Sequence, residues 1–115
     1  MPPAPLPIYT TVIELTDWTF DRTASFPKSQ RFTFGQRLDN FMLDAIELVI
    51  TARFAARPEK MQALRQLNVT LEKLRVLWSL SATRGWITMR QLFYVHKTLD
   101  EIGQQAGAWI RSLEK

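Results

Sequence analysis

The sequence predicts an all-α protein, specifically an up-down-up-down antiparallel four-helix bundle. Four stretches carry apolar residues at the spacing of one helix face, and no stretch alternates like a strand bounded by turns. The connections between the four stretches are short, which favours antiparallel neighbours. At 115 residues the chain is long enough for one domain with its own hydrophobic core.

The first helix is predicted from Ile8 to Thr23, after the proline-rich stretch MPPAPLP. Each proline lacks a backbone N–H and restricts the residue before it, so residues 1–7 are expected to form an extended, mobile arm. The bundle domain then spans residues 8–115. The apolar face of this first helix consists of Ile8, Val12, Leu15 and Trp18, and Pro27 marks the break after it.

The second helix is predicted to begin near Ser29, a residue type that often caps a helix N-terminus. Its apolar face consists of Phe34, Leu38, Phe41, Met42, Ala45, Leu48, Val49, Ala52 and Ala56. Pro58 then suits the first residue of a third helix. The apolar face of that helix consists of Met61, Leu64, Leu67, Leu71, Leu74, Leu77 and Trp78.

The fourth helix follows a predicted loop over Ser81–Ile87, which contains Gly85. Thr88 and Gln91 have the spacing of a capping box, in which each side chain accepts a hydrogen bond from the backbone N–H of the other residue. The apolar residues after them alternate between gaps of three and four, which is the pattern of a heptad seam. They are Leu92, Val95, Leu99, Ile102, Ala106, Trp109 and Leu113.

Several large apolar residues lie off these stripes or in connections. They are Phe20, Phe26, Phe32, Phe54, Trp86, Phe93, Tyr94 and Ile110. Each of them could seal an end of the bundle. As a group they also suggest a second buried surface, most simply an interface between subunits.

The sequence lacks the residue patterns of enzymes and metal proteins. His96 is the only histidine and Phe93 stands three residues before it, so the Glu-x-x-His pairs of di-metal bundles are missing. We expect His96 to be structural, and Asp44 and Glu47 to be solvated partners of cations. There is no phosphate-binding glycine loop and no nucleophile elbow. We therefore expect a protein that is not an enzyme and needs no metal, cofactor or small-molecule substrate.

The absence of cysteine excludes disulfides and thiolate metal sites, and it fits a reducing, cytoplasmic location. MPPAPLP has neither the cationic nor the apolar region of a signal peptide. No apolar run approaches the ~18 residues of a membrane span, so we expect no membrane partner.

The net charge of +4 (15 − 11) conceals a clustered distribution. One run of cations without acids spans Arg22 to Arg37, and a second spans Lys73 to Lys97. In an antiparallel bundle the first and third connections lie at the same end, together with two helix N-termini and their free N–H groups. Cations are locally unfavourable beside helix N-termini, which are the positive ends of the helix dipoles. One explanation for their presence is that this end of the bundle is a solvated basic surface without a partner.

The other explanation, which we favour, is binding of phosphate or an acidic protein at this end. Arg84 and Arg90, in and after the third connection, would take part. No recognition helix or aromatic platform is evident, so binding should be directed at the phosphate backbone and sensitive to salt. Gly35 would serve close packing that a side chain would block, or a close approach of a phosphate backbone.

Motifs along most of the chain, from about Ile8 to Leu113, are specific in combination. They are IYTTVIELTDW, FPKSQRF followed by GQR, NVTLEKLRVLWSL, LDEIG and GAWIRSL. Together they resemble the Avd proteins, the accessory variability determinants of diversity-generating retroelements. These belong to a wider four-helix-bundle family that includes the rRNA intervening-sequence proteins.

The resemblance implies a homopentameric barrel of four-helix bundles and a non-catalytic partner of the retroelement reverse transcriptase. It also implies binding to template RNA and cDNA in support of mutagenic retrohoming. By this resemblance, the basic contacts of the family are expected at Lys28, Arg31 and Arg37 in FPKSQRF and GQR, and at Lys73 and Arg75 in NVTLEKLRVLWSL. The alternative is a stand-alone assembly or regulatory bundle of the intervening-sequence type, with no polymerase partner.

Overall fold

The computed structural model describes residues 6–115 as four long helices and two short helical segments. The long helices are α1 (Leu6–Ala24), α3 (Gln36–Phe54), α4 (Arg57–Thr83) and α5 (Met89–Leu113). Between α1 and α3 lie one turn of α-helix, α2 (Lys28–Gln30), and a π-helical turn, η1 (Arg31–Gly35), which runs directly into α3. The described residues contain no strand, so the predicted all-α fold is confirmed.

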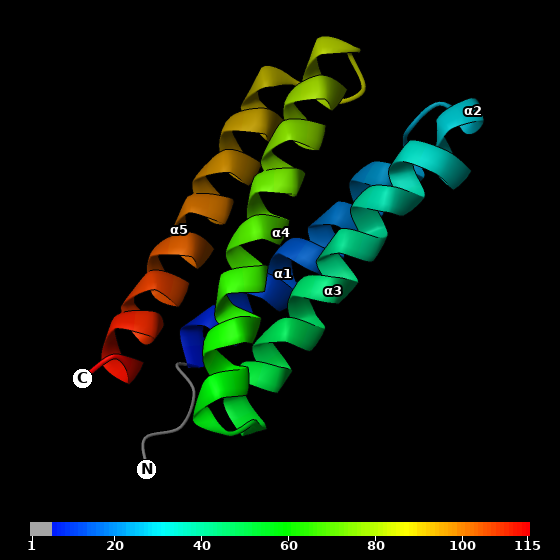
Figure 1. Ribbon diagram of the computed structural model, residues 1–115. Coiled ribbons are helices and arrows are strands. Elements are labelled where there is room, and N and C mark those ends of the chain that lie inside the picture. The colour runs from blue at the N-terminus through cyan, green and yellow to red at the C-terminus, as the bar shows by residue number, and fades with distance from the viewer. Residues whose placement is uncertain (1–5) are drawn as a thin grey trace.

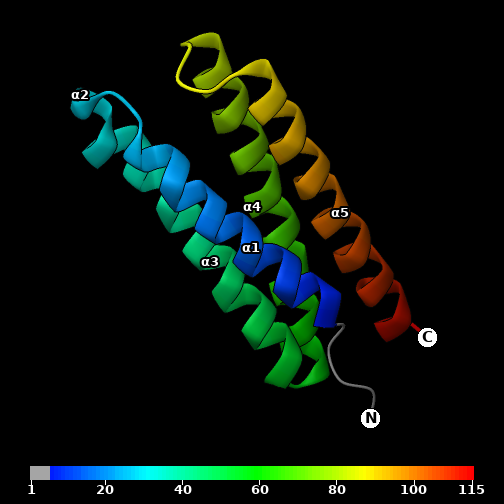
Figure 2. The ribbon, with the colours of Figure 1, turned by 180° about the vertical axis from the view of Figure 1, so that it is seen from behind.

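The long helices run alternately up and down along an elongated body of 46 × 24 × 19 Å (Figure 1). α3 packs against α1 and α4, α4 also packs against α5, and α1 completes the ring against α5. Seen from behind in Figure 2, α1 lies between α3 and α5. The α1–α2 connection and the α4–α5 connection lie at the same end, as the alternation predicts, and we call this the loop end.

The core consists mainly of the predicted apolar stripes. α1 contributes Ile8, Val12 and Leu15, and α3 contributes Leu38, Met42 and Val49, all essentially inaccessible to solvent. α4 and α5 contribute Leu64, Leu67, Leu74, Trp78, Val95, Leu99 and Ile102. Burial of this apolar area, at about 25 cal/mol per Å², stabilises the bundle and fixes the directions in which its polar residues point.

Three predicted boundaries are wrong. α1 begins at Leu6, so Leu6 and Pro7 of the predicted arm are helical, and residues 1–5 lie outside the described residues. A proline in the first turn is tolerated because the N–H that it lacks would have no partner there. Ser29 is not an N-cap, because the turn begins at Lys28 after Pro27 and has no side-chain cap.

The predicted loop over Ser81–Ile87 is shorter than expected, because α4 continues to Thr83. The Ser81 side chain is buried, and its hydroxyl donates to the Leu77 carbonyl 2.9 Å away. Gly85 then turns the chain with a φ of 78°, in the left-handed region that glycine adopts without strain. The predicted capping box of Thr88 and Gln91 is confirmed, with both reciprocal hydrogen bonds present.

Candidate functional site

An aromatic cluster anchors the two connections at the loop end. Phe26, which follows α1, is buried, and its ring centroid lies 5.3 Å from that of Trp86 in the α4–α5 connection. Trp78 of α4 meets Phe26 edge-on at 6.1 Å, and Phe34 of η1 meets Trp86 at 5.2 Å. Phe26 and Trp86 therefore seal this end of the bundle, which is one of the two roles predicted for them.

The π-helical turn η1 was not predicted from the sequence. Its wider turn leaves Phe34 half-buried and Gly35 buried, while Arg31, Phe32 and Thr33 between Gln30 and Phe34 are exposed. A Cβ added to Gly35 would lie 3.5 Å from both the Gln30 carbonyl oxygen and Thr23 Cβ, which is ordinary contact. The expectation that a side chain here would be blocked is therefore wrong for the packing within the chain.

Arg31 and Asp39 face a shallow groove between η1, the end of α1 and α3. Arg31 Nε donates to the Phe26 carbonyl at 3.1 Å, which fixes the start of the side chain. Thr23 of α1 donates to Asp39 Oδ1 at 2.7 Å. Burial raises the pKa of Asp39, and the Thr23 hydrogen bond opposes that rise.

Two of the predicted contact residues, Arg37 and Lys73, meet at one aromatic ring. The guanidinium carbon of Arg37 (α3) lies 6.0 Å from the ring centroid of Phe41. The ammonium nitrogen of Lys73 (α4) lies 5.5 Å from the same centroid. Neither side chain forms an ion pair or a hydrogen bond with residues 6–115. Two exposed cations from different helices are thus held side by side on the α3–α4 face.

Lys28, Arg84 and Arg90 are exposed at the loop end and form no ion pair with any described residue. The Arg84 guanidinium lies 5.8 Å from the centroid of Trp86, so it covers the aromatic seal. The free helix N-termini that we expected here are only partly available. At α5 the Gln91 N–H is already bonded to Thr88.

Arg75 lies apart from the other predicted contacts. It faces α5, where its guanidinium forms ion pairs with Asp100 at 2.6 Å and with Glu72 at 3.4 Å. Two carboxylates therefore balance this cation within the chain. Its predicted role in binding remains a prediction, but the structure does not place it with the unpaired cations.

His96 joins α5 to α4, which is the structural role expected for it. Its Nε2 lies 3.2 Å from the Ser79 hydroxyl and 3.3 Å from the Arg75 carbonyl. A carbonyl oxygen only accepts, so the tautomer with the proton on Nε2 satisfies this contact. Asp44 and Glu47 are exposed on α3, where we expected solvated side chains.

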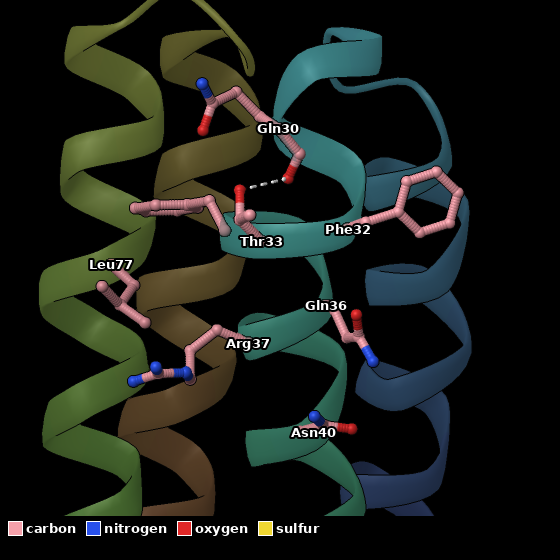
Figure 3. A pocket seen from close by; sticks show the side chains of 8 residues that line it. Gln30, Phe32, Thr33, Gln36, Arg37, Asn40 and Leu77 are labelled. Atoms are coloured by element: carbon pink, nitrogen blue, oxygen red, sulfur yellow. Dashed lines mark hydrogen bonds between the residues drawn. The ribbon is translucent and has the colours of Figure 1, made fainter.

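Five of the aromatic residues left over from the stripes are exposed: Phe20, Phe32, Phe54, Phe93 and Tyr94. Phe32, at 77%, is the most exposed aromatic side chain of residues 6–115. Phe32 borders the groove of Arg31 and also a second groove, which contains Arg37 and Leu77. Figure 3 shows this second groove. The sequence had indicated no aromatic platform. Helical spacing does not predict the π-helical turn, and Phe32 points outward because of that turn.

Metal binding and membrane crossing can also be examined in the described residues. Residues 6–115 contain no group of three or more histidine, cysteine or acidic side chains that could hold a metal ion. Within the same residues, no helix combines the length and apolar character needed to cross a membrane.

The fold and the charged surface define an all-helical bundle with unpaired cations at one end and on the adjoining α3–α4 face. Residues 8–113 match the model of the bAvd-like family, so the chain belongs to that family. This match confirms the resemblance that the sequence motifs indicated. No curated protein and no solved structure matches the chain.

Proposed function

We propose that this chain is a non-catalytic accessory protein of a diversity-generating retroelement. In this role it binds the reverse transcriptase and the template RNA or cDNA, in support of mutagenic retrohoming. The observation that carries the proposal is the match to the bAvd-like family over residues 8–113. The predicted contacts Lys28, Arg31, Arg37, Lys73, Arg84 and Arg90 are exposed, which supports a surface that attracts phosphates.

The binding surface is centred on Arg37 and Lys73. Cations that already serve the fold are expected to contribute little to a partner, as with Arg75 and its two carboxylates. Arg37 and Lys73 have no carboxylate partner among residues 6–115 and share one side of the bundle. The fork of donors on arginine and the ammonium of lysine both suit phosphate oxygens.

We also propose that the protein assembles as a homo-oligomer, and a homopentamer is the state that the Avd resemblance implies. α1 exposes Tyr9, Ile13 and Phe20 at the spacing of one face, and the same helix carries exposed carboxylates at Glu14 and Asp17.

α4 also exposes an apolar stripe, and the charged residues near this stripe are basic rather than acidic. Val69, Val76 and Leu80 lie on one side of this helix with Arg65 among them, and Lys73 lies at the edge of the stripe next to α3. Contact between the α1 and α4 stripes of successive subunits is head-to-tail, and such contacts form a ring when the rotation from one subunit to the next closes. A ring of five would carry a charge of 5 × 4 = +20.

The test of the binding function reverses the charge at the central pair. The Arg37→Glu, Lys73→Glu double variant changes the net charge from +4 to 0, since each substitution removes two units. We expect its affinity for RNA to fall about tenfold or more, with a shallower dependence on salt. Capture of the reverse transcriptase of the same retroelement should also fall.

The matched control is Arg53→Glu with Arg57→Glu, two exposed cations at the α3–α4 turn, which makes the same change of charge away from the loop end and from both apolar stripes. Equal losses in the two double variants would reduce the effect to net charge and contradict the assigned surface. Undiminished binding of RNA and of the polymerase by the Arg37→Glu, Lys73→Glu variant would contradict it as well. Sedimentation tests the assembly separately: about 67 kDa is expected for five copies of 13.4 kDa, and Val76→Glu should release smaller species.

A further inference from the structure

Phe32 occupies an unusual position for a large apolar side chain. Its neighbours in the connection, Phe26 and Phe34, are held by Trp86, so the backbone that carries Phe32 is anchored on both sides. The π-helical turn between these anchors directs Phe32 away from the core, with 77% of the side chain exposed. π-helical turns are frequent at functional sites, and Phe32 differs from the equally exposed Phe54 in the π-helical turn that carries it and in the grooves that it borders.

The surroundings of Phe32 are polar and cationic rather than those of a simple apolar patch. Phe32, Gln36 and Asn40 follow one another at intervals of four residues and border both grooves. In Figure 3 these three side chains point to the same side, while Arg37 extends toward α4. Arg31 lines the first groove and Arg37 the second, so each groove that Phe32 borders also contains an arginine.

This combination matches the chemistry of an unpaired nucleotide. A phenyl face stacks on the π face of a base, and side-chain amides offer donors and acceptors to a base edge. Guanidinium groups on both sides suit the phosphates before and after that base. In a duplex the bases are already stacked inside the helix, so duplex offers this site no base. Asp39 is the only carboxylate that lines either groove.

We propose that Phe32 is a stacking platform for an unpaired base, and that it makes this face selective for single-stranded over double-stranded nucleic acid. The inference rests on the proposed nucleic-acid-binding function and specifies its ligand. Phe32 holds the base, Gln36 and Asn40 lie beside its edge, and Arg31 and Arg37 hold the backbone. The site uses no contact to a 2′-hydroxyl, so RNA and DNA single strands are equivalent ligands.

The test compares Phe32→Leu with Phe32→Trp in the full chain. Leucine keeps an apolar side chain but removes the π face, and tryptophan retains it. Each protein is titrated into a fluorescein-labelled, unstructured RNA of about 20 nucleotides, the DNA of the same sequence, and the corresponding DNA duplex. Fluorescence anisotropy at one fixed salt concentration gives the three affinities.

Phe32→Leu should weaken the affinity for both single strands by about 5- to 150-fold, which is the usual effect of losing one stacked base. It should change duplex affinity less than about twofold, and Phe32→Trp should bind single strands nearly as the unmodified protein does. Phe54→Leu is the matched control, because Phe54 is 76% exposed at the opposite end and has Arg53 over its ring. It should leave all three affinities unchanged, and all variants should keep the same melting temperature and sedimentation.

The outcomes separate this inference from the proposed function. If Phe32→Leu changes the affinities for single strands and for duplex equally, or changes neither affinity, the stacking role is wrong. The proposed function still stands in that case if Arg37→Glu with Lys73→Glu weakens RNA binding. If Phe32→Leu spares nucleic acid but abolishes capture of the reverse transcriptase, or changes the sedimentation, Phe32 is a protein contact and the inference is overturned. If the unmodified protein binds none of the three ligands, the stacking role and the proposed nucleic-acid binding fail together.

Discussion

The two ends of the bundle both carry cations, but Lys60 at the α3–α4 turn satisfies helix carbonyls, whereas Lys28 and Arg90 at the loop end do not. At the α3–α4 turn, Lys60 Nζ donates to the carbonyls of Ala52 and Arg53, at 2.7 and 2.8 Å. These are carbonyls of the last turn of α3, which lack helical partners, and a cation there also complements the helix dipole. This part of the basic composition is therefore explained by local stability.

At the loop end the same explanation does not apply. Lys28 stands in the first turn after Pro27 and Arg90 in the first turn of α5, where the helix dipole is positive. Neither donates a side-chain hydrogen bond to residues 6–115. The comparison shows that the groups a cation contacts, here two carbonyls at the C-terminus of α3, distinguish a structural residue from a candidate contact, which net charge cannot do.

The largest expected difference between the ends concerns one phenylalanine at each. Phe26→Ala should lower the free energy of unfolding by about 3–5 kcal/mol, because it removes a buried ring that joins Phe34, Trp78 and Trp86. Phe54→Ala, at a side chain that is 76% exposed, should change it by about 0.5 kcal/mol or less. Urea unfolding followed by circular dichroism measures both. Similar losses would mean that Phe54 is buried in the assembled protein.

The second prediction concerns the cations themselves. Lys60→Met keeps the apolar stem but removes the ammonium that satisfies two carbonyls of α3, and it should cost about 1–2 kcal/mol of stability. Lys28→Met, at an exposed position without a partner in the described chain, should be neutral or stabilise by a few tenths of a kcal/mol. The same unfolding experiment compares them. A larger loss for Lys28→Met than for Lys60→Met would reverse the assignment of structural and unpaired cations.

The sequence was sufficient to predict the four long helices, because their apolar stripes have helical periodicity and the core selects for that spacing. It was also sufficient for the capping box of Thr88, a local pattern that needs no tertiary information. It was insufficient at Ser29, because a cap depends on backbone geometry as well as residue type. Here Pro27 occupies the N-cap position, and Ser29 lies inside the turn.

A third prediction follows from these two helix starts. Thr88→Ala removes the hydroxyl that accepts from the Gln91 N–H and should cost about 1 kcal/mol. Ser29→Ala should cost almost nothing, because α2 has no side-chain cap. Thermal unfolding of the two variants checks the pair. A clear loss in Ser29→Ala alone would restore Ser29 as a capping residue.

The candidate site could be predicted only in part. Runs of cations without acids correctly predicted that Lys28, Arg84 and Arg90 lie at the loop end, because the alternation of helix directions is predictable. Their role in binding stays a prediction. The pairing of Arg75 with Asp100 was not predictable, since those residues stand 25 positions apart and meet only when α4 packs on α5. The outward turn of Phe32 was hidden for a similar reason, because it depends on a π-helical turn and on the aromatic anchors around it.

The smallest effect is expected at Asp39, the one carboxylate that lines the grooves beside Phe32. Burial raises its pKa in the folded protein above the ordinary value of about 4. The folded state therefore holds this proton more tightly than the unfolded chain does. The resulting contribution to stability is fully present below the ordinary pKa and is lost as the pH rises through the raised value.

Asp39→Asn removes the desolvated charge and keeps an oxygen that can accept from Thr23. Relative to the unmodified protein, the variant should gain up to about 0.5 kcal/mol at pH 7 and less at pH 3.5. Urea unfolding at the two pH values measures this difference. A variant that loses stability at pH 7 but not at pH 3.5 would mean that the folded protein favours the carboxylate. Because the substitution also removes the negative charge beside Arg31, it should modestly raise affinity for single-stranded RNA, whereas Asp44→Asn, farther along α3, should not.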